Sequence, residues 1–172
     1  MVEIITTKRM IDTVNRKIEK FHFDKEKGLS RFGSEKERTY YGYLGEQIVM
    51  AYLGINIDND DYNYDLTYKE FKLEVKSISC KFKPLQHFLC TVNSYNLTGI
   101  HKQYADYYVF TRILNDKSKG WILGYIDCDK FFKIGRFVPK GTELVKDVRF
   151  VKANATVLEI NRLKPIQELR SL

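Results

Sequence analysis

The segment 64–79, YDLTYKEFKLEVKSIS, constrains the fold most, because apolar and charged residues alternate along it as they do in paired strands. Its second half predicts a strand whose successive side chains point to opposite faces of a sheet. One face of that strand carries Phe71, Leu73 and Val75. The other face carries Lys72, Glu74 and Lys76.

A turn at Lys69-Glu70 would fold this segment into a β-hairpin. The register that buries the apolar residues together pairs Tyr68 with Phe71 and Leu66 with Leu73. Continuing outward, Asp65 lies opposite Glu74, with the two β-carbons ~5 Å apart. Lys-Glu is not a favoured pair for a type I′ turn, so a longer turn would shift this register.

Two facing carboxylates repel each other unless a cation lies between them or one of them takes up a proton. Lys76, two residues after Glu74, neutralises part of the charge. Two carboxylates with an adjacent ammonium suit a Mg²⁺ or Mn²⁺ site, because these ions prefer oxygen ligands and keep water positions open. Taken alone, the Glu-x-Lys triplet is more typical of an ordinary solvated strand face than of a catalytic one in a chain that is 30% charged.

The segment 34–53 predicts the clearest helix. It begins with SEKE, a capping box from Ser34 to Glu37, and Gly54 follows it as a left-handed C-terminal cap. Glu46 lies on an apolar face of this helix, where a carboxylate is costly without a partner. Gly42 and Gly45 suggest a close approach to another element. Glu46 could therefore reach the hairpin site, or it could form an ordinary salt bridge.

The remaining segments complete an α/β (α+β) domain around one sheet. A helix is expected over TKRMIDTVNRKIEKF, strands over INID, HFLCTVNSYN, ADYYVFTRIL and GWILGYI, and a short helix over CDKFFKI between Asp127 and Gly135. The segment after residue 147 predicts an edge strand and a C-terminal tail. We expect one domain over residues 1–172: a helical lead-in at 1–33, a core at 34–113 and C-terminal strands with a short helix at 114–172.

Composition narrows the class of protein. Net charge is +7, which favours anionic partners such as nucleic acid, although a Lys- and Asn-rich composition from an AT-rich genome would produce the same bias. No apolar run approaches the ~20 residues that cross a membrane, and the N-terminus lacks a signal peptide. Three widely spaced cysteines argue against a disulfide framework or structural zinc, so a cytoplasmic protein is expected.

Helix, Asp and Glu-x-Lys in this order resemble the PD-(D/E)XK nuclease superfamily. Its members place an Asp near the end of one strand and Glu/Asp-x-Lys in the next, often after a helix with an acidic residue. The matching segments here are GEQIVMAYLG, YDLT and LEVKS, within residues 36–113. The EVKS ending is typical of archaeal-type Holliday junction resolvases and of many phage-encoded members. Asn63-Tyr64 stands where the name-giving Pro would be, at a position that varies in the superfamily.

The resemblance implies a restriction-endonuclease-like central mixed sheet flanked by helices. It also implies that Asp65, Glu74 and the Val75 carbonyl hold a divalent metal, and that Glu46 completes the coordination directly or through water. Lys76 would orient or deprotonate the attacking water and stabilise charge on the phosphate. Ser77 would support the site.

Further residues are candidates for contacting a DNA backbone. They are Lys72, Lys81, Lys83, Lys102 and Gln103. Each is equally an ordinary solvated residue. His22, His87 and His101 show no metal-ligand spacing and are expected to be structural. No phosphate-cradling Gly-rich loop is present, so ATP dependence is not supported.

These patterns predict a Mg²⁺- or Mn²⁺-dependent deoxyribonuclease, with an endonuclease favoured over an exonuclease, DNA as partner and a homodimer as one option. Its size and style of resemblance favour a phage or another mobile element. The alternatives are a non-catalytic DNA-binding or assembly protein that retains the fold, and a structural protein whose charged cluster is a salt-bridged surface.

Overall fold

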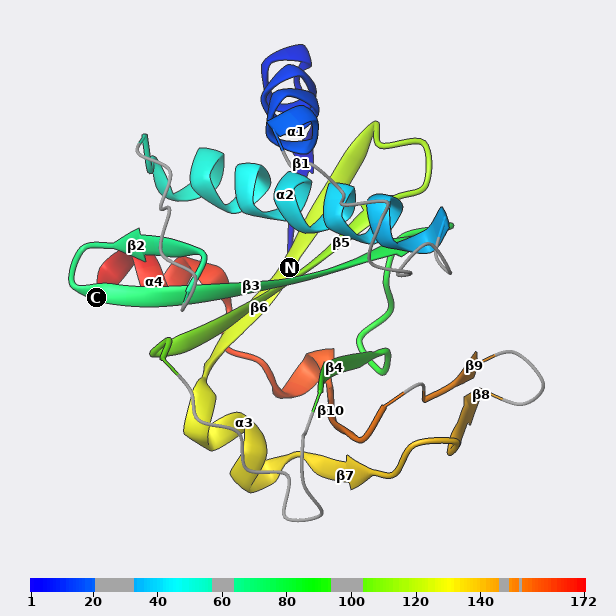
Figure 1. The fold of residues 1–172 in the computed structure, drawn as a ribbon. Coiled ribbons are helices and arrows are strands. Elements are labelled where there is room, and N and C mark those ends of the chain that lie inside the picture. Colours follow the sequence, from blue (N-terminus) through cyan, green and yellow to red (C-terminus); the bar gives the residue numbers. More distant parts are fainter. Residues whose placement is uncertain (21–32, 57–63, 94–103, 146–148, 152) are drawn as a thin grey trace.

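A computed structural model describes residues 1–20, 33–56, 64–93, 104–145, 149–151 and 153–172 of the chain. Over these residues the fold is α+β, with helices packed on a curled mixed sheet (Figure 1). The sheet has five strands in the order β1-β6-β5-β3-β2. They are β1 (Val2–Ile5), β2 (Leu66–Tyr68), β3 (Phe71–Cys80), β5 (Tyr107–Leu114) and β6 (Lys119–Asp127). β3 and β5 are parallel, and the other neighbours in this sheet are antiparallel.

The predicted hairpin register is confirmed. β2 pairs with β3 through Leu66 and Leu73 and through Tyr68 and Phe71. Lys69, in the turn, has a φ of 54°, a left-handed conformation that the tight reversal requires of it. The ladder stops at Leu66, so the pairing does not extend to a formal Asp65–Glu74 pair.

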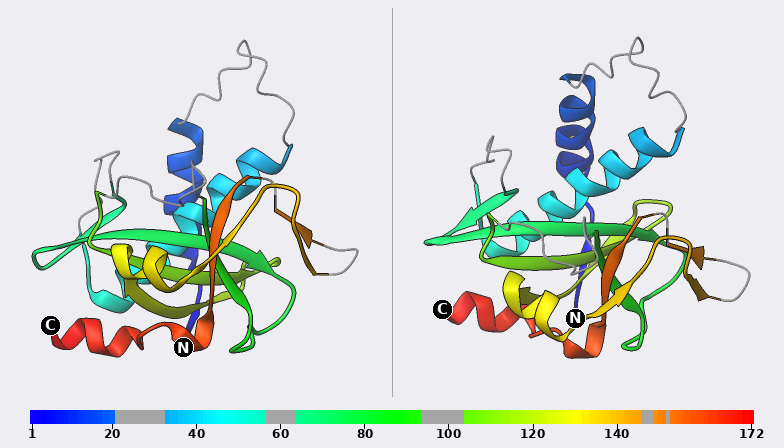
Figure 2. Two further views of the ribbon diagram at one scale, coloured as in Figure 1. Left: turned by 90° about the horizontal axis from the view of Figure 1, so that it is seen from below. Right: turned by 60° about the horizontal axis from the view of Figure 1, so that its bottom comes forward.

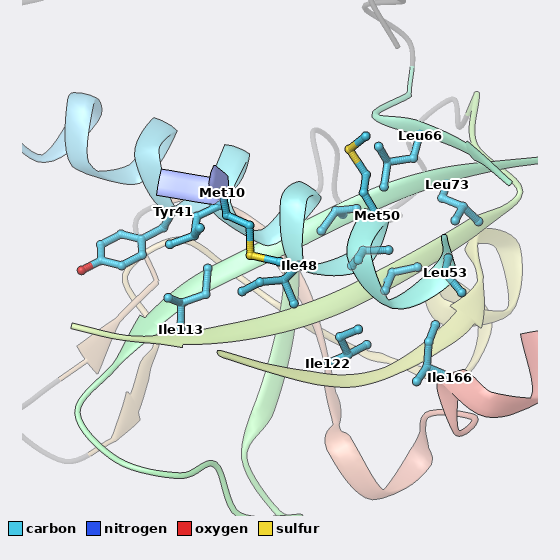
Figure 3. Packing of buried hydrophobic residues seen from close by; sticks show 14 of the residues in the cluster. Met10, Tyr41, Ile48, Met50, Leu53, Leu66, Leu73, Ile113, Ile122 and Ile166 are labelled. Atoms are coloured by element: carbon cyan, nitrogen blue, oxygen red, sulfur yellow. The ribbon is translucent and has the colours of Figure 1, made fainter. Parts of the chain in front are cut away.

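The helices α1 (Lys8–Lys20) and α2 (Gly33–Leu53) cover one face of the five-stranded sheet. α1 packs on α2 through Met10, Val14 and Ile18, which recur at four-residue intervals and are buried. Apolar residues of α2 then point to the strands, as Figure 3 shows for Ile48 and Leu53. Among the described residues, none of the helices has the length and apolar character needed to cross a membrane.

A second layer lies on the opposite face of the sheet. It contains α3 (Cys128–Ile134) and a three-stranded sheet of β4 (Leu89–Asn93), β10 (Ala155–Glu159) and β7 (Arg136–Val138). Figure 2 views the molecule from this side. Tyr108, Phe110 and Trp121 face this layer, whereas Val109 and Ile122 face α2, as strand alternation requires. A further pair, β8 (Glu143–Val145) and β9 (Arg149–Phe150), forms a two-stranded sheet.

Two predicted helix ends are confirmed. Gly54 has a φ of 75°, the left-handed conformation expected after α2. Asp127 caps α3 by accepting a hydrogen bond from the Lys130 N–H at 2.8 Å, and Gly135 follows the last residue of that helix. α2 begins at Gly33, one residue before the predicted cap.

Several sequence-based expectations are wrong. The strands form more than one sheet, and the lead-in starts with β1, which pairs with β6 instead of being helical throughout. Residues 55–56 are not a strand, and the rest of INID lies outside the described residues. The C-terminal segment is not a tail, because β10 is central in its sheet and is followed by the 3₁₀ helix η2 (Ile160–Arg162) and by α4 (Ile166–Ser171).

Candidate active site

The candidate site forms where β2 ends and leaves one edge of β3 uncovered. β2 pairs with β3 only as far as Leu73, and no other strand of the described residues pairs with β3 on this side. The Asp65 N–H donates to the Leu73 carbonyl at 3.0 Å. The Val75 N–H donates to Asp65 Oδ2 at 2.6 Å. Since the N–H and C=O of one strand residue point to the same side, the Val75 carbonyl faces the same open edge.

Asp65 is half-buried at this edge, and its carboxylate is electrostatically strained. Loss of hydration, and next the negative charge of Glu74, raise the pKa of Asp65 to about 6. The Val75 N–H, Lys76 and Lys17 act in the opposite direction and lower it. Asp65 and Glu74 are therefore close enough to repel each other, as the hairpin register predicts.

Glu74 and Lys76 project from the face of β3 that carries Tyr108 on the neighbouring strand. Lys76 Nζ lies 2.6 Å from Glu74 Oε1 and 5.9 Å from the centroid of the Tyr108 ring. Both charged side chains remain partly exposed, so solvent and a ligand can reach them. Burial raises the pKa of the Tyr108 phenol well above its ordinary range, and the nearby Cys128 and Glu74 add to this effect. Tyr108 is thus a neutral wall of the site.

Gly45 brings α2 close to the strands beside the site. A β-carbon on Gly45 would lie 1.8 Å from Ser77 Oγ and 2.7 Å from Thr111 Oγ1. Thr111 Oγ1 in turn donates to Ser77 Oγ at 2.8 Å. The close approach predicted for Gly45 is confirmed, but the one predicted for Gly42 is wrong, because nothing lies within 4 Å of a β-carbon there. Ser77 packs under α2 and supports the strand that carries Glu74.

Glu46 lies on the other side of the edge, between α1 and α2. It is buried, with 8% of its surface exposed, and its Oε2 is 3.3 Å from Lys17 Nζ. Lys17 also lies over the ring of Tyr43, with its Nζ 4.8 Å from the ring centroid. The sequence reasoning missed Lys17. The available signal was its place between Val14 and Ile18, at the border of the apolar face of α1.

The predicted DNA-contacting residues are partly described. Lys72, Lys81 and Lys83 are exposed on or after β3, and Lys72 Nζ lies 5.3 Å from the centroid of the Tyr64 ring. Lys102 and Gln103 lie outside the described residues. His22 and His101 lie outside them as well, whereas His87 is exposed and packs edge-on against Phe88.

The donors at the edge fit an ion that keeps several waters. Asp65 and Glu74 supply two carboxylates, and the Val75 carbonyl supplies a third oxygen facing the same edge. Mg²⁺ is commonly bound in this way, by one or two carboxylates with water and substrate phosphate completing the octahedron. A divalent cation would also relieve the repulsion that raises the pKa of Asp65. Within the described residues, no three acidic, histidine or cysteine side chains form a metal-binding group by themselves.

Comparison with protein-family models and with curated proteins gives no match to this chain. The resemblance to a nuclease superfamily therefore depends on the residues quoted above and on their geometry.

Proposed function

We propose that this chain is a divalent-metal-dependent deoxyribonuclease of the PD-(D/E)XK type. The observation that carries the proposal is the electrostatic repulsion between Glu74 and Asp65, whose carboxylate accepts the Val75 N–H at the open edge of β3, with Lys76 paired to Glu74. Electrostatic strain of this kind is costly in a resting protein and is common at functional sites.

We propose a restriction-endonuclease-like fold for the same region. In its support, a long helix, α2, is followed by the β2–β3 hairpin and, after β4 of the second sheet, by β5, which is parallel to β3 in a mixed sheet. Helices also flank the sheet, with α2 on one face and α3 on the other. The order of Asp65, Glu74 and Lys76 along the hairpin is the one that the resemblance implies, and this order supports the proposal.

The residues divide the chemistry of phosphodiester hydrolysis among them. A divalent ion held by Asp65, Glu74 and the Val75 carbonyl would activate a water molecule and offset charge on the phosphate. Lys76, held at 2.6 Å by Glu74, would orient that water and stabilise the negative charge that develops on the phosphate oxygens. Ser77 keeps β3 in place against α2 through its contacts with Gly45 and Thr111.

DNA is the proposed substrate. The net charge of +7 favours a polyanion, and the exposed Lys72, Lys81 and Lys83 extend a positive surface from the hairpin beyond the end of β3. We propose internal cleavage of DNA, with a homodimer as the form that would cut both strands.

Incubation with linear, circular, branched and single-stranded DNA in Mg²⁺ or Mn²⁺ tests the proposal. Wild type should cleave at least one of these DNAs, with circular DNA reporting endonuclease action, and EDTA should abolish cleavage. Lys76→Ala and Asp65→Ala should each lose activity by 100-fold or more, as for the removal of one key electrostatic group. Lys119→Ala is a matched control, because Lys119 forms a similar exposed ion pair with Glu3 at the far edge of the sheet and should cleave normally.

Binding without cleavage would point to the alternative, a non-catalytic DNA-binding or assembly protein with the same fold. In that case DNA would be retarded on gels by wild type, while no DNA would be cut with either metal. Cleavage that persists in both Lys76→Ala and Asp65→Ala would place the active site elsewhere.

A further inference from the structure

Lys17 lies on α1, next to α2 and outside the group of site residues that the sequence predicts. Met10, Val14 and Ile18 bury one face of α1, and this fixes the rotation of the helix about its axis. Lys17 then lies at the border of that face, with 22% of its side chain exposed. Part of it is therefore accessible to an anion from solvent.

Two residues of α2 hold the Lys17 ammonium group. Glu46 Oε2 lies 3.3 Å from Nζ, and the centroid of the Tyr43 ring lies 4.8 Å from it. Tyr43 and Glu46 are three residues apart and so lie on one face of α2. A carboxylate and an aromatic ring together restrict a long side chain that would otherwise lose rotamer entropy on binding a ligand. Lys17 is thus preorganised.

Lys17 belongs to the same group of charges as the candidate site. Its positive charge stabilises the ionised form of Asp65, which bonds to the Val75 N–H at the open edge of β3. The packing of α2 brings Lys17 to this strand, because its partner Glu46 is next to Gly45, which lies against Ser77 of β3, two residues after Val75. A DNA strand passing along the edge would meet both Lys17 and Lys76.

The charges around the edge favour a phosphate once a metal ion is present. Glu46, Asp65 and Glu74 carry three negative charges when all are ionised, and Lys17 and Lys76 carry two positive charges. The group then has one net negative charge, which a divalent cation reverses to one net positive charge. Without Lys17 the group would be neutral with the metal, and it would attract the DNA backbone less strongly.

We propose that Lys17 binds a backbone phosphate next to the scissile one, and that Glu46 holds Lys17 in position instead of binding the metal. This inference rests on the proposed nuclease function. It replaces the metal-ligand role that the family resemblance implied for Glu46. Glu46 is a positioning residue in this scheme, and α1 becomes part of the DNA-binding machinery.

The test compares variants of Lys17 and Glu46 that remove or keep the side-chain charge, and it uses two binding measurements that need no cleavage. Mn²⁺ affinity is measured by calorimetry, and DNA affinity is measured by fluorescence anisotropy with EDTA and with Mn²⁺ on a non-cleavable phosphorothioate duplex. The variants are Glu46→Gln, Lys17→Gln, Lys17→Arg and the Lys17→Gln/Glu46→Gln double variant. The double variant removes both charges of the ion pair, so it tests Lys17 even if Lys17→Gln alone is unstable because the Glu46 charge is no longer offset. Asp65→Asn is the control for lost metal binding, and Arg16→Gln removes an exposed charge from the same turn of α1.

We expect Mn²⁺ affinity to stay within about twofold of wild type in Glu46→Gln, Lys17→Gln and the double variant, and to fall at least tenfold in Asp65→Asn. DNA affinity with Mn²⁺ should fall about fivefold to tenfold in Lys17→Gln and in the double variant, whereas Lys17→Arg should keep most of it, since a guanidinium group also binds phosphate. The loss should be smaller in Glu46→Gln, because the lost positioning of Lys17 is offset by the removal of a negative charge. The loss should be smaller in EDTA, where the group is net negative. Arg16→Gln should change DNA affinity by less than twofold.

Two results would overturn the inference. A tenfold loss of Mn²⁺ affinity in Glu46→Gln would make Glu46 a metal ligand, and unchanged DNA affinity in the double variant would remove Lys17 from the DNA interface. Failure of the nuclease proposal is distinguishable. Wild type that binds Mn²⁺ and DNA with the expected variant pattern, but cuts no natural DNA, keeps the role of Lys17 and rejects catalysis.

Discussion

At the scale of single residues, Asp65 lowers the stability of the folded chain at neutral pH. Its pKa lies at about 6, against an ordinary value of 3.8, because burial and Glu74 disfavour the ionised form. At neutral pH the folded chain nevertheless holds this carboxylate ionised. The difference between the two pKa values corresponds to roughly 3 kcal/mol of lost stability when no cation is bound.

Asp65→Asn should therefore stabilise the metal-free protein at pH 8. The Asn side-chain oxygen can still accept the Val75 N–H, so the variant loses the charge and retains the bond. Because the raised pKa belongs to the folded state, the contribution of Asp65 to stability is fully present below pH 3.8, declines as the pH rises to about 6 and is lost above it. We expect Asp65→Asn to gain about 1–3 kcal/mol in urea unfolding with EDTA at pH 8, and no more than a small fraction of that at pH 4.

Asp116→Asn provides a comparison of opposite sign. Asp116 accepts hydrogen bonds from the N–H and hydroxyl of Ser118, and these bonds lower the pKa of its carboxyl. Neutralising it should not stabilise the protein at pH 8. An Asp65→Asn variant that is less stable than wild type at pH 8 without metal would contradict the electrostatic account of the site.

The residues of the site differ in how far the sequence could reveal them. Asp65, Glu74 and Lys76 were predictable, because strand alternation and a buried apolar register determine which side chains face one another. Lys17 was not, because its contact with Glu46 depends on how α1 packs on α2. Alternation also could not show that β2 ends at Leu66, so that Asp65 and Glu74 repel each other without forming the predicted cross-strand pair.

At the scale of elements, the packing of α2 on β3 positions the site. Gly45 allows this contact, since a β-carbon there would overlap Ser77 Oγ. Gly42, one turn earlier on the same helix, has open space where its β-carbon would lie. Substitution by alanine should therefore change stability in opposite directions at the two glycines.

Gly45→Ala should destabilise the protein by about 1–3 kcal/mol, because overpacking outweighs the better helix propensity of Ala. Gly42→Ala should stabilise it by up to ~1 kcal/mol, since only the propensity changes. Both values follow from urea denaturation at neutral pH. Equal effects of the two substitutions would show that α2 does not press on Ser77 in solution.

The element after β10 gives a second contrast of this kind. α4 lies where a tail was expected, and its Ile166 and Leu169 are fully buried, whereas Leu172 is 55% exposed. Only seven residues, fewer than two helical turns, follow Pro165 in the sequence, so the periodic signal was too short to predict a helix.

Leu169→Ala should cost about 2–5 kcal/mol, as expected for a buried leucine. Leu172→Ala should change stability by less than ~0.5 kcal/mol. Thermal unfolding followed by circular dichroism distinguishes them. If the two variants melt together with wild type, α4 does not pack on the sheet as the structure has it.

At the scale of the whole molecule, the α+β class followed from the order of predicted elements, but the number of sheets did not. The second sheet joins β4 to β10, although every element from β5 to β9 lies between them along the chain. β1 is four residues long and pairs with β6, which lies more than a hundred residues later in the sequence. Such pairings depend on which edges remain open after the core has formed, and local residue patterns do not contain this information.

The charge of the whole molecule leads to the last prediction, on how DNA binding depends on salt. If basic side chains that contribute to the net charge of +7 contact DNA phosphates, the logarithm of the binding constant should fall linearly with log[salt]. The slope should be about −0.9 for each phosphate contact with duplex DNA. Lys81 and Lys83 are exposed just beyond β3, so replacing both by Gln should reduce the slope by up to about 1.8. Lys140→Gln, an exposed lysine after β7, serves as the control and should leave the slope unchanged. Fluorescence anisotropy titrations measure these slopes between about 50 and 200 mM NaCl, a range over which phosphate contacts change the affinity strongly. A slope that is the same in wild type and in the double variant would mean that DNA does not continue past the end of β3, and would confine the interface to the hairpin edge and α1.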